Sequence, residues 1–175
     1  TMKIFRAFLI IIVLIPLVLI VKSSMTTYDV TDEAIINASS DVVFKALGNE
    51  FAGKTSWWMP HLSSKLREGY SLGETGAIYD IIIHGKRPLK FTYKSLEIKK
   101  NEMSRGIYIE GAFRGESIYK LEDIEGKTKL SLRWRVKPSG LVFKIFAPFF
   151  PIEKSHSDVM QYGFKNLNKY LDKRS

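Results

Sequence analysis

The stretch KLSLRWRVK, residues Lys129–Lys137, alternates between apolar side chains and basic or polar ones. Leu130, Leu132, Trp134 and Val136 fall on one side, and the basic residues and Ser131 fall on the other. A period of two predicts a β-strand with one buried face and one solvated face, which is typical of antiparallel sheets. The outer face of this strand is expected to be strongly basic.

Segments with a similar period of two precede this strand, and glycines separate several of them. They lie at residues 28–38, 73–85, 89–100, 104–116 and 116–126. After the strand at 28–38, the pattern predicts five or six antiparallel strands, and Lys129–Lys137 is one of them. A slip of phase is expected near Ser95, and turns are expected at Gly115 and Gly126.

Helical spacing appears on both sides of the strands. Ser39 or Ser40 can cap a helix that ends near Gly48, and a second short helix or turn follows over Glu50–Met59. The C-terminal segment Glu153–Ser175 places apolar side chains on one face at spacings of three and four. These side chains are Met160, Phe164, Leu167 and Leu171.

This order of elements predicts an α+β fold, in which one curved antiparallel sheet has a long C-terminal helix across its concave side. A sheet wrapped around a single helix often cannot fill its own interior, so a cavity is expected. Gly163 lies in the apolar stripe of the helix, where it would let another group approach the helix backbone closely.

The N-terminus is the most apolar part of the chain. Ala7–Val21 is uninterrupted by polar residues, and counting from Ile4 gives a helix about 27 Å long, which is enough to cross a bilayer. This length favours an uncleaved single-pass anchor. Lys3 and Arg6 before the run, against Lys22 after it, favour an orientation with the domain on the outer side. The alternative is a signal peptide and a secreted protein. We divide the chain into an anchor or signal segment at 1–25 and a domain at 26–175.

The composition narrows the class of protein. The net charge of +9 suits anionic partners, but no basic run is interleaved with aromatic residues, so we expect no nucleic-acid partner. The chain has no cysteine, which excludes disulfides and thiolate chemistry. The three histidines have no spacing typical of an iron or zinc site, and no metal or other cofactor is expected.

Three stretches together resemble the START-like or SRPBCC superfamily, and more narrowly its polyketide cyclase/dehydrase and lipid-transport branch. They are AIINASSDVVFKAL (34–47), TSWWMPH (55–61) and MQYGFKNLNKYLDK (160–173). The resemblance covers roughly residues 28–173 and implies the helix-grip fold, with a cavity for a hydrophobic small molecule between sheet and helix. It implies no particular reaction.

Under this resemblance we expect a set of mainly aromatic residues to bind the ligand. They are Trp57, Trp58, Tyr79, Asp80, Tyr93, Tyr119, Trp134, Phe146, Met160 and Phe164. For the adjacent tryptophans two placements stay open: they line the cavity entrance, or one fills the core while the other covers its rim.

Several polar residues are candidates for acid/base chemistry. Asp80 and Glu110 interrupt apolar strands, although alternation favours an outward Glu110. His61 could act as a base or lie at the surface, whereas His84 is expected in a turn and His156 in solvent. Near the Gly115 turn, Arg114, Glu116 and Tyr119 are more typical of solvated positions.

The segment PSGLVFKIFAPFFP, Pro138–Pro151, is too apolar for a free loop. It would form a flap over the cavity, dock on a membrane, or pack on the core as a short helix. These features favour a membrane-tethered binder of a hydrophobic molecule, a lipid by class. The alternatives are a cyclase or dehydratase and a non-ligand assembly module, and no protein partner can be named.

Overall fold

The computed structural model describes the backbone of residues 2–173 and the side chains of residues 12–173. The chain folds into twelve elements in the described part. In chain order these are α1 (Met2–Met25), β1 (Tyr28–Ile36), α2 (Ser40–Phe51), β2 (Leu62–Leu66), β3 (Ile78–Ile83), β4 (Leu89–Lys99), β5 (Met103–Glu110), β6 (Phe113–Ile124), β7 (Lys127–Pro138), α3 (Leu141–Phe146), the 3₁₀ helix η1 (Ala147–Phe149) and α4 (Ile152–Asp172).

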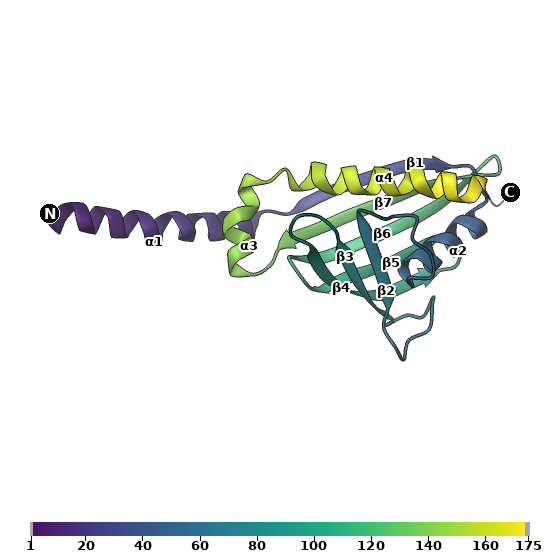
Figure 1. Cartoon of the computed structure of the whole chain (residues 1–175), viewed down its shortest axis with the longest axis horizontal. Coiled ribbons are helices and arrows are strands. Elements are labelled where there is room, and N and C mark those ends of the chain that lie inside the picture. The colour runs from purple at the N-terminus through teal and green to yellow at the C-terminus, as the bar shows by residue number, and fades with distance from the viewer. Residues whose placement is uncertain (1, 174–175) are drawn as a thin grey trace.

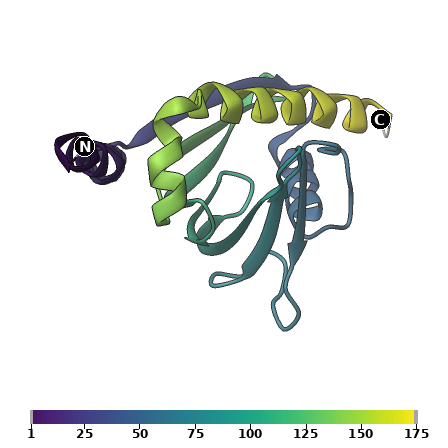
Figure 2. The same ribbon diagram turned by 60° about the vertical axis from the view of Figure 1, so that its left-hand side comes forward.

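The strands form a single antiparallel sheet in the order β1-β7-β6-β5-β4-β3-β2. The sheet curls strongly, and α4 lies across the opening of the curl beside β1 (Figures 1 and 2). The predicted α+β helix-grip architecture is therefore confirmed. Because β1 pairs with β7, the first strand of the chain forms one edge of the sheet. Helix α2 packs near the other edge, where it contacts β2.

The predicted helix face is the one that packs. Met160, Phe164, Leu167 and Leu171 of α4 are all buried. Polar side chains of α4 also bond to the free edge of β1: Asn168 Nδ2 donates to the Ile35 carbonyl at 2.9 Å. These contacts cover a strand edge that would otherwise offer unpaired backbone groups to another chain.

Strand β7 has the alternation that its sequence predicts. Its four apolar side chains are buried, and its basic side chains lie on the outer face. There, Arg133 lies 2.6 Å from Asp29 on the neighbouring β1. This pair is exposed and contributes little to the free energy of unfolding.

Two strand predictions need correction. The turn expected at Gly115 lies at Gly111 instead, and Gly115 sits inside β6 opposite Val136. A Cβ atom on Gly115 would overlap the backbone of β7, so glycine is needed there for close strand packing, not for a turn. Strand β2 was not predicted, since LSSKL lacks a clear alternation. The slip near Ser95 is confirmed as a register shift between Ser95 and Glu97.

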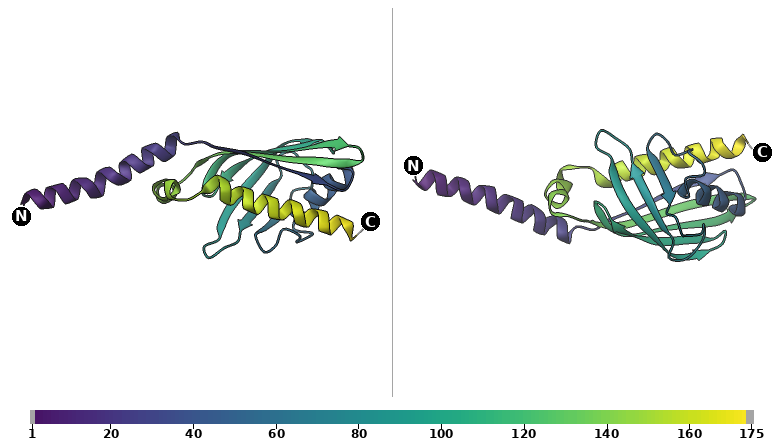
Figure 3. Two further views of the ribbon diagram at one scale, coloured as in Figure 1. Left: turned by 90° about the horizontal axis from the view of Figure 1, so that it is seen from above. Right: turned by 60° about the horizontal axis from the view of Figure 1, so that its bottom comes forward.

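Helix α1 projects away from the domain, and its C-terminal end packs against α3 (Figures 1 and 3). Ser23, which is buried, donates a hydrogen bond to the Lys144 carbonyl. Within the portion of the chain whose side chains are described, no helix is both long and apolar enough to cross a membrane. The predicted span Ala7–Val21 lies partly outside the described side chains, which begin at residue 12.

Candidate functional site

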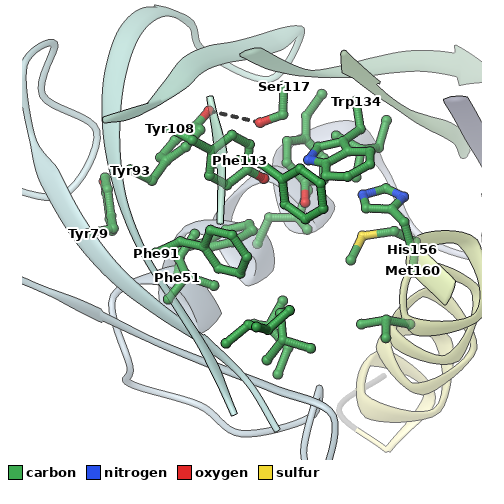
Figure 4. Close-up of a pocket in the computed structure, with 18 of the residues that line it drawn as sticks. Phe51, Tyr79, Phe91, Tyr93, Tyr108, Phe113, Ser117, Trp134, His156 and Met160 are labelled. Carbon is green, nitrogen blue, oxygen red and sulfur yellow. Dashed lines mark hydrogen bonds between the residues drawn. The ribbon is translucent and has the colours of Figure 1, made fainter. Parts of the chain in front are cut away.

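A cavity of about 990 Å³ lies between the concave face of the sheet and helices α2, α3 and α4. Figure 4 shows its aromatic side chains turned toward an open centre, with His156 and Met160 on α4 facing them. Most of the lining is apolar or aromatic, which suits a hydrophobic ligand more than a polar one.

Six of the predicted ligand-binding residues line this cavity: Tyr79, Tyr93, Tyr119, Trp134, Phe146 and Met160. Five of them come from the sheet or from α4, where the period of the sequence fixes which side chains face inward. Phe146 belongs to α3. The structure brings these six together in one place.

The adjacent tryptophans lie outside the cavity lining, and the same is true of Phe164. Trp58 is fully buried and Trp57 nearly so, with their rings stacked at 4.9 Å between centroids. Phe164 packs behind Trp58 at 6.3 Å. All three side chains belong to the buried core, so of the two placements left open for the tryptophans the structure favours the core over the cavity entrance.

A buried carboxylate fixes the tryptophan turn. Glu50, at the end of α2, accepts hydrogen bonds from the backbone N–H groups of Trp57 and Trp58 at 3.1 and 3.0 Å. It also accepts one from the Thr55 hydroxyl at 2.6 Å. Glu50 is 2% exposed, and these donors satisfy a charge that would otherwise be costly to bury. No pattern in the sequence identified this residue.

Asp80 does not face the cavity either. Tyr79 points inward, and the next residue of a strand must point outward. On the outer face Asp80 pairs with Arg67 at 2.7 Å, and hydrogen bonds from this guanidinium lower the pKa of Asp80. Asp80 is therefore a surface ion-pair residue and not a ligand anchor.

Glu110 also points outward, as predicted, but alternation was the wrong reason. Tyr93 pairs with Tyr108 and Thr92 pairs with Glu110, so the ladder skips Ile109. This irregularity reverses the phase of the strand. Tyr108 consequently lines the cavity, while Glu110 accepts a hydrogen bond from Thr92 at 2.7 Å on the outer face.

Hydroxyl groups gather on the inner face of three neighbouring strands. We call Tyr93, Ser95, Tyr108 and Ser117 the hydroxyl cluster, and all four line the cavity. Ser117 donates to the Tyr93 hydroxyl at 3.2 Å, the bond drawn dashed in Figure 4. Burial raises the pKa of Tyr108 to about 12 and also raises that of Tyr93, so both phenols are neutral at physiological pH.

His156 was expected in solvent, but it lies in the cavity wall. Its ring stacks on Trp134 at 4.3 Å, and Nδ1 lies 3.2 Å from Oδ2 of the buried Asp32. Burial opposes ionisation of Asp32, yet its contacts with His156, Ser157 and Gln161 outweigh this and lower its pKa. His156 is the one imidazole of the described residues beside the cavity.

The other polar candidates do not converge on the cavity. His61 packs edge-on against Tyr162 at 4.4 Å, and His84 bonds to Ser63. Arg114 and Glu116 lie on the outer face of β6, whereas Tyr119 faces inward. Across the residues that the structure describes, no group of acidic and histidine side chains could hold a metal ion.

The segment 141–150, made of α3, η1 and Phe150, forms one end of the cavity. We call it the α3–η1 segment. Val142, Phe146 and Phe150 line the cavity and are 53–69% exposed. Leu141 and Phe149 add further exposed apolar area. The segment contains a short helix, as one of the three alternatives held, but it packs on the core only in part: Phe143 contacts Phe113, and no residue of α3 is fully buried.

No family model and no curated protein matches the chain. Several solved structures are similar to it. The protein TTHA0849 from Thermus thermophilus has a TM-score of 0.67 and 15% identity, over 85% of this chain and 99% of that one. A START superfamily protein from Mycobacterium smegmatis has a TM-score of 0.64 and 12% identity, over 84% and 99%.

A third similar structure is the aromatase/cyclase Zhui from Streptomyces sp. R1128, with a TM-score of 0.62 and 8% identity over 83% of this chain and 96% of that one. At such low identities these similarities establish the fold alone. The chain has the START-like, or SRPBCC-like, helix-grip fold, as the sequence resemblance implies.

Proposed function

We propose that this protein binds a hydrophobic small molecule, a lipid by class, in the cavity between the sheet and α4, and that α1 tethers it to a membrane. The observation that carries the proposal is a cavity of about 990 Å³ with a mainly apolar lining. Burial of each ligand methylene there would contribute about 0.8 kcal/mol, so a long chain would bind strongly. The similar START superfamily structure is consistent with this use of the fold.

The α3–η1 segment is the proposed entrance. Its apolar side chains face the cavity on one side and the outside on the other, so a lipid passing between them would stay in contact with apolar surface. Opening would break the packing of α3 on α1, including the hydrogen bond from Ser23 to the Lys144 carbonyl, but no residue of α3 itself is fully buried. Opening of this segment would join the cavity to the bilayer interior.

The tether is supported by the sequence and by the position of α1. Ala7–Val21 is apolar, and the positive residues Lys3 and Arg6 precede it. In the described part, side chains from Ile12 to Val21 are largely exposed, which favours a nonpolar environment around them. We place the domain on the outer side of the membrane. Cleavage after α1 would instead give a secreted protein.

The experiment is native mass spectrometry of the full chain purified from membranes, followed by organic extraction of bound molecules. A discrete lipid bound one to one supports the proposal. The matched variant is Met160→Trp, which would fill part of the cavity from α4 and should lose the bound lipid while keeping the fold. If neither protein carries or takes up any lipid from a defined mixture, the proposal is wrong.

The second candidate is an enzyme of the cyclase or dehydratase type. One observation favours it: His156 lines the cavity, and its Nδ1 lies 3.2 Å from the carboxylate of Asp32, which could orient it as a general base. An enzyme would need Asp80, His61, Glu110 or Tyr119 to point inward together, and only Tyr119 lines the cavity, which weighs toward binding. Loss of turnover, but not of ligand, in His156→Gln would favour the enzyme. The third alternative, a non-ligand assembly module, gives no reason for a large internal cavity and is therefore less favoured.

A further inference from the structure

Ser95 is an unusual residue in the cavity wall because its hydroxyl has no partner. It is 2% exposed, and among the described residues no atom forms a hydrogen bond with its Oγ. Its backbone is satisfied, since its N–H bonds to Ala77 and its carbonyl accepts from Gly76. A buried hydroxyl without a partner costs free energy, and a ligand that bonds to it would recover that cost.

The surroundings of Ser95 offer more of the same chemistry. Tyr93 and Ser117 of the hydroxyl cluster are nearly fully buried. Gly106, opposite Ser95 on β5, makes room for the Tyr93 phenol, because a Cβ atom there would overlap the Tyr93 ring and hydroxyl. The Tyr93 hydroxyl accepts a bond from Ser117, which leaves its own proton free for an acceptor on a ligand.

The cluster is electrically neutral. Burial raises the pKa of both tyrosines, so neither becomes a phenolate, and none of the four residues carries a charge at physiological pH. The Lys and Arg residues of the lining, Lys45, Lys86 and Arg87, are exposed and lie at its edge. An anionic group would therefore stay at the edge, whereas the interior cluster suits an uncharged oxygen.

We propose that the hydroxyl cluster recognises a single uncharged oxygen function, a hydroxyl or carbonyl, on an otherwise apolar ligand. This inference rests on the proposed function and assigns its ligand class. Ser95 and Tyr93 would bond to that oxygen, and the apolar part of the ligand would fill the rest of the cavity. Hydrocarbons and carboxylates of equal size would bind less tightly.

The test uses the full chain in lipid nanodiscs and three probes of nearly equal size: naphthalene, 2-naphthol and 2-naphthoate. Quenching of intrinsic tryptophan fluorescence reports binding, and empty nanodiscs correct for partitioning. One neutral hydrogen bond should make 2-naphthol bind roughly threefold to tenfold tighter than naphthalene. Ser95→Ala combined with Tyr93→Phe should abolish this preference without weakening naphthalene. The control variant is Ser131→Ala, which removes a serine hydroxyl from the outer face of β7, and it should keep the preference for 2-naphthol.

The other outcomes separate the two proposals. Equal binding of naphthalene and 2-naphthol by the unsubstituted protein would overturn the role of the hydroxyl cluster and leave the binding function standing. A second outcome would also overturn the role of the hydroxyl cluster: 2-naphthoate binds most tightly, Ser95→Ala does not change this, and the double variant Lys86→Ala, Arg87→Ala loses it. Recognition would then lie with the basic residues at the edge of the cavity. Failure of all three probes to bind would count against the binding function itself.

Discussion

Trp58 lies against the backbone of α4 at Gly163, so closely that a Cβ atom on Gly163 would overlap the indole ring. One turn earlier in the helix, the Val159 carbonyl accepts a hydrogen bond from Nε1 of Trp58 at 2.9 Å. This contact fastens α4 to the turn between α2 and β2. It holds the helix across the sheet and so keeps the cavity open beneath it.

Gly163→Ala should therefore destabilise the protein by about 1–3 kcal/mol, because the added methyl group has no room. In a helix without such a contact the same change would stabilise by about 1 kcal/mol. Urea denaturation measures the change in the free energy of unfolding. A decrease means that the overlap with Trp58 dominates, and an increase means that the higher helix propensity of alanine dominates.

A second variant isolates the contact. Trp58→Phe removes part of the ring that meets Gly163, so Gly163→Ala should cost less in that background than alone. Equal costs in the two backgrounds would mean that the glycine is needed for some reason other than the indole.

Glu50→Ala should be more harmful than an ordinary surface change. It would leave the N–H groups of Trp57 and Trp58 buried without an acceptor, at a cost of about 1–3 kcal/mol each. Glu50→Gln keeps one side-chain oxygen and should cost less. The exposed neighbour Lys54→Ala serves as the control in the same denaturation experiment. If Glu50→Ala matched that control, the carboxylate would have no structural role.

The sequence predicted the strands and α4 well because burial there follows a simple period. Leu130 to Val136 and Met160 to Leu171 each face one way, and the alternation of side chains is a direct consequence of backbone geometry. The same rule failed at Ile109, where an extra residue reverses the phase of β5. Irregularities of this kind depend on the neighbouring strand, which a single sequence does not reveal.

The site was predicted in part for the same reason. Alternation predicts which sheet residues face the cavity. It does not predict the positions of Glu50, whose partners include backbone N–H groups, or of His156, whose neighbour Asp32 is distant in the sequence. A signal for Asp32 did exist: it shares the phase of Val30, Ala34 and Ile36, which places it on the buried face of β1. A buried aspartate needs a partner, and this should direct attention to the three histidines.

The pair Asp32–His156 predicts how stability changes with pH. The pKa of folded Asp32 lies below its ordinary value of 3.8, so the carboxylate stabilises the fold above that value, and this contribution is lost as the pH falls through the lower folded pKa. At neutral pH, Asp32→Asn should cost about 1–3 kcal/mol. The difference from the unsubstituted protein should narrow on acidification.

Urea unfolding from about pH 7 to about pH 2.5 would measure this difference. Asp158→Asn, which removes an exposed carboxylate of α4, is the matched control and should change stability by less than about 1 kcal/mol. A difference for Asp32→Asn that stays constant over the whole pH range would mean that packing, and not charge, explains its effect.

The α3–η1 segment gives the sharpest test of membrane contact, because the chain has no cysteine and one can be introduced at will. Phe149 is 68% exposed, at the end of the domain where α3 packs on α1 (Figure 1). If α1 crosses a bilayer, that packing holds Phe149 at the lipid surface. A polarity-sensitive fluorophore on Phe149→Cys should then shift to shorter wavelength in nanodiscs and be quenched by lipids spin-labelled near the headgroup.

The matched control for this label lies at the far end of the domain. Asp123 lies on β6 and pairs with Thr128 at the start of β7, the end of that strand opposite α3. The same fluorophore on Asp123→Cys should report water and be quenched by iodide. Equal quenching of both labels by iodide would separate the α3–η1 segment from the membrane, and the lipid would then need another way into the cavity.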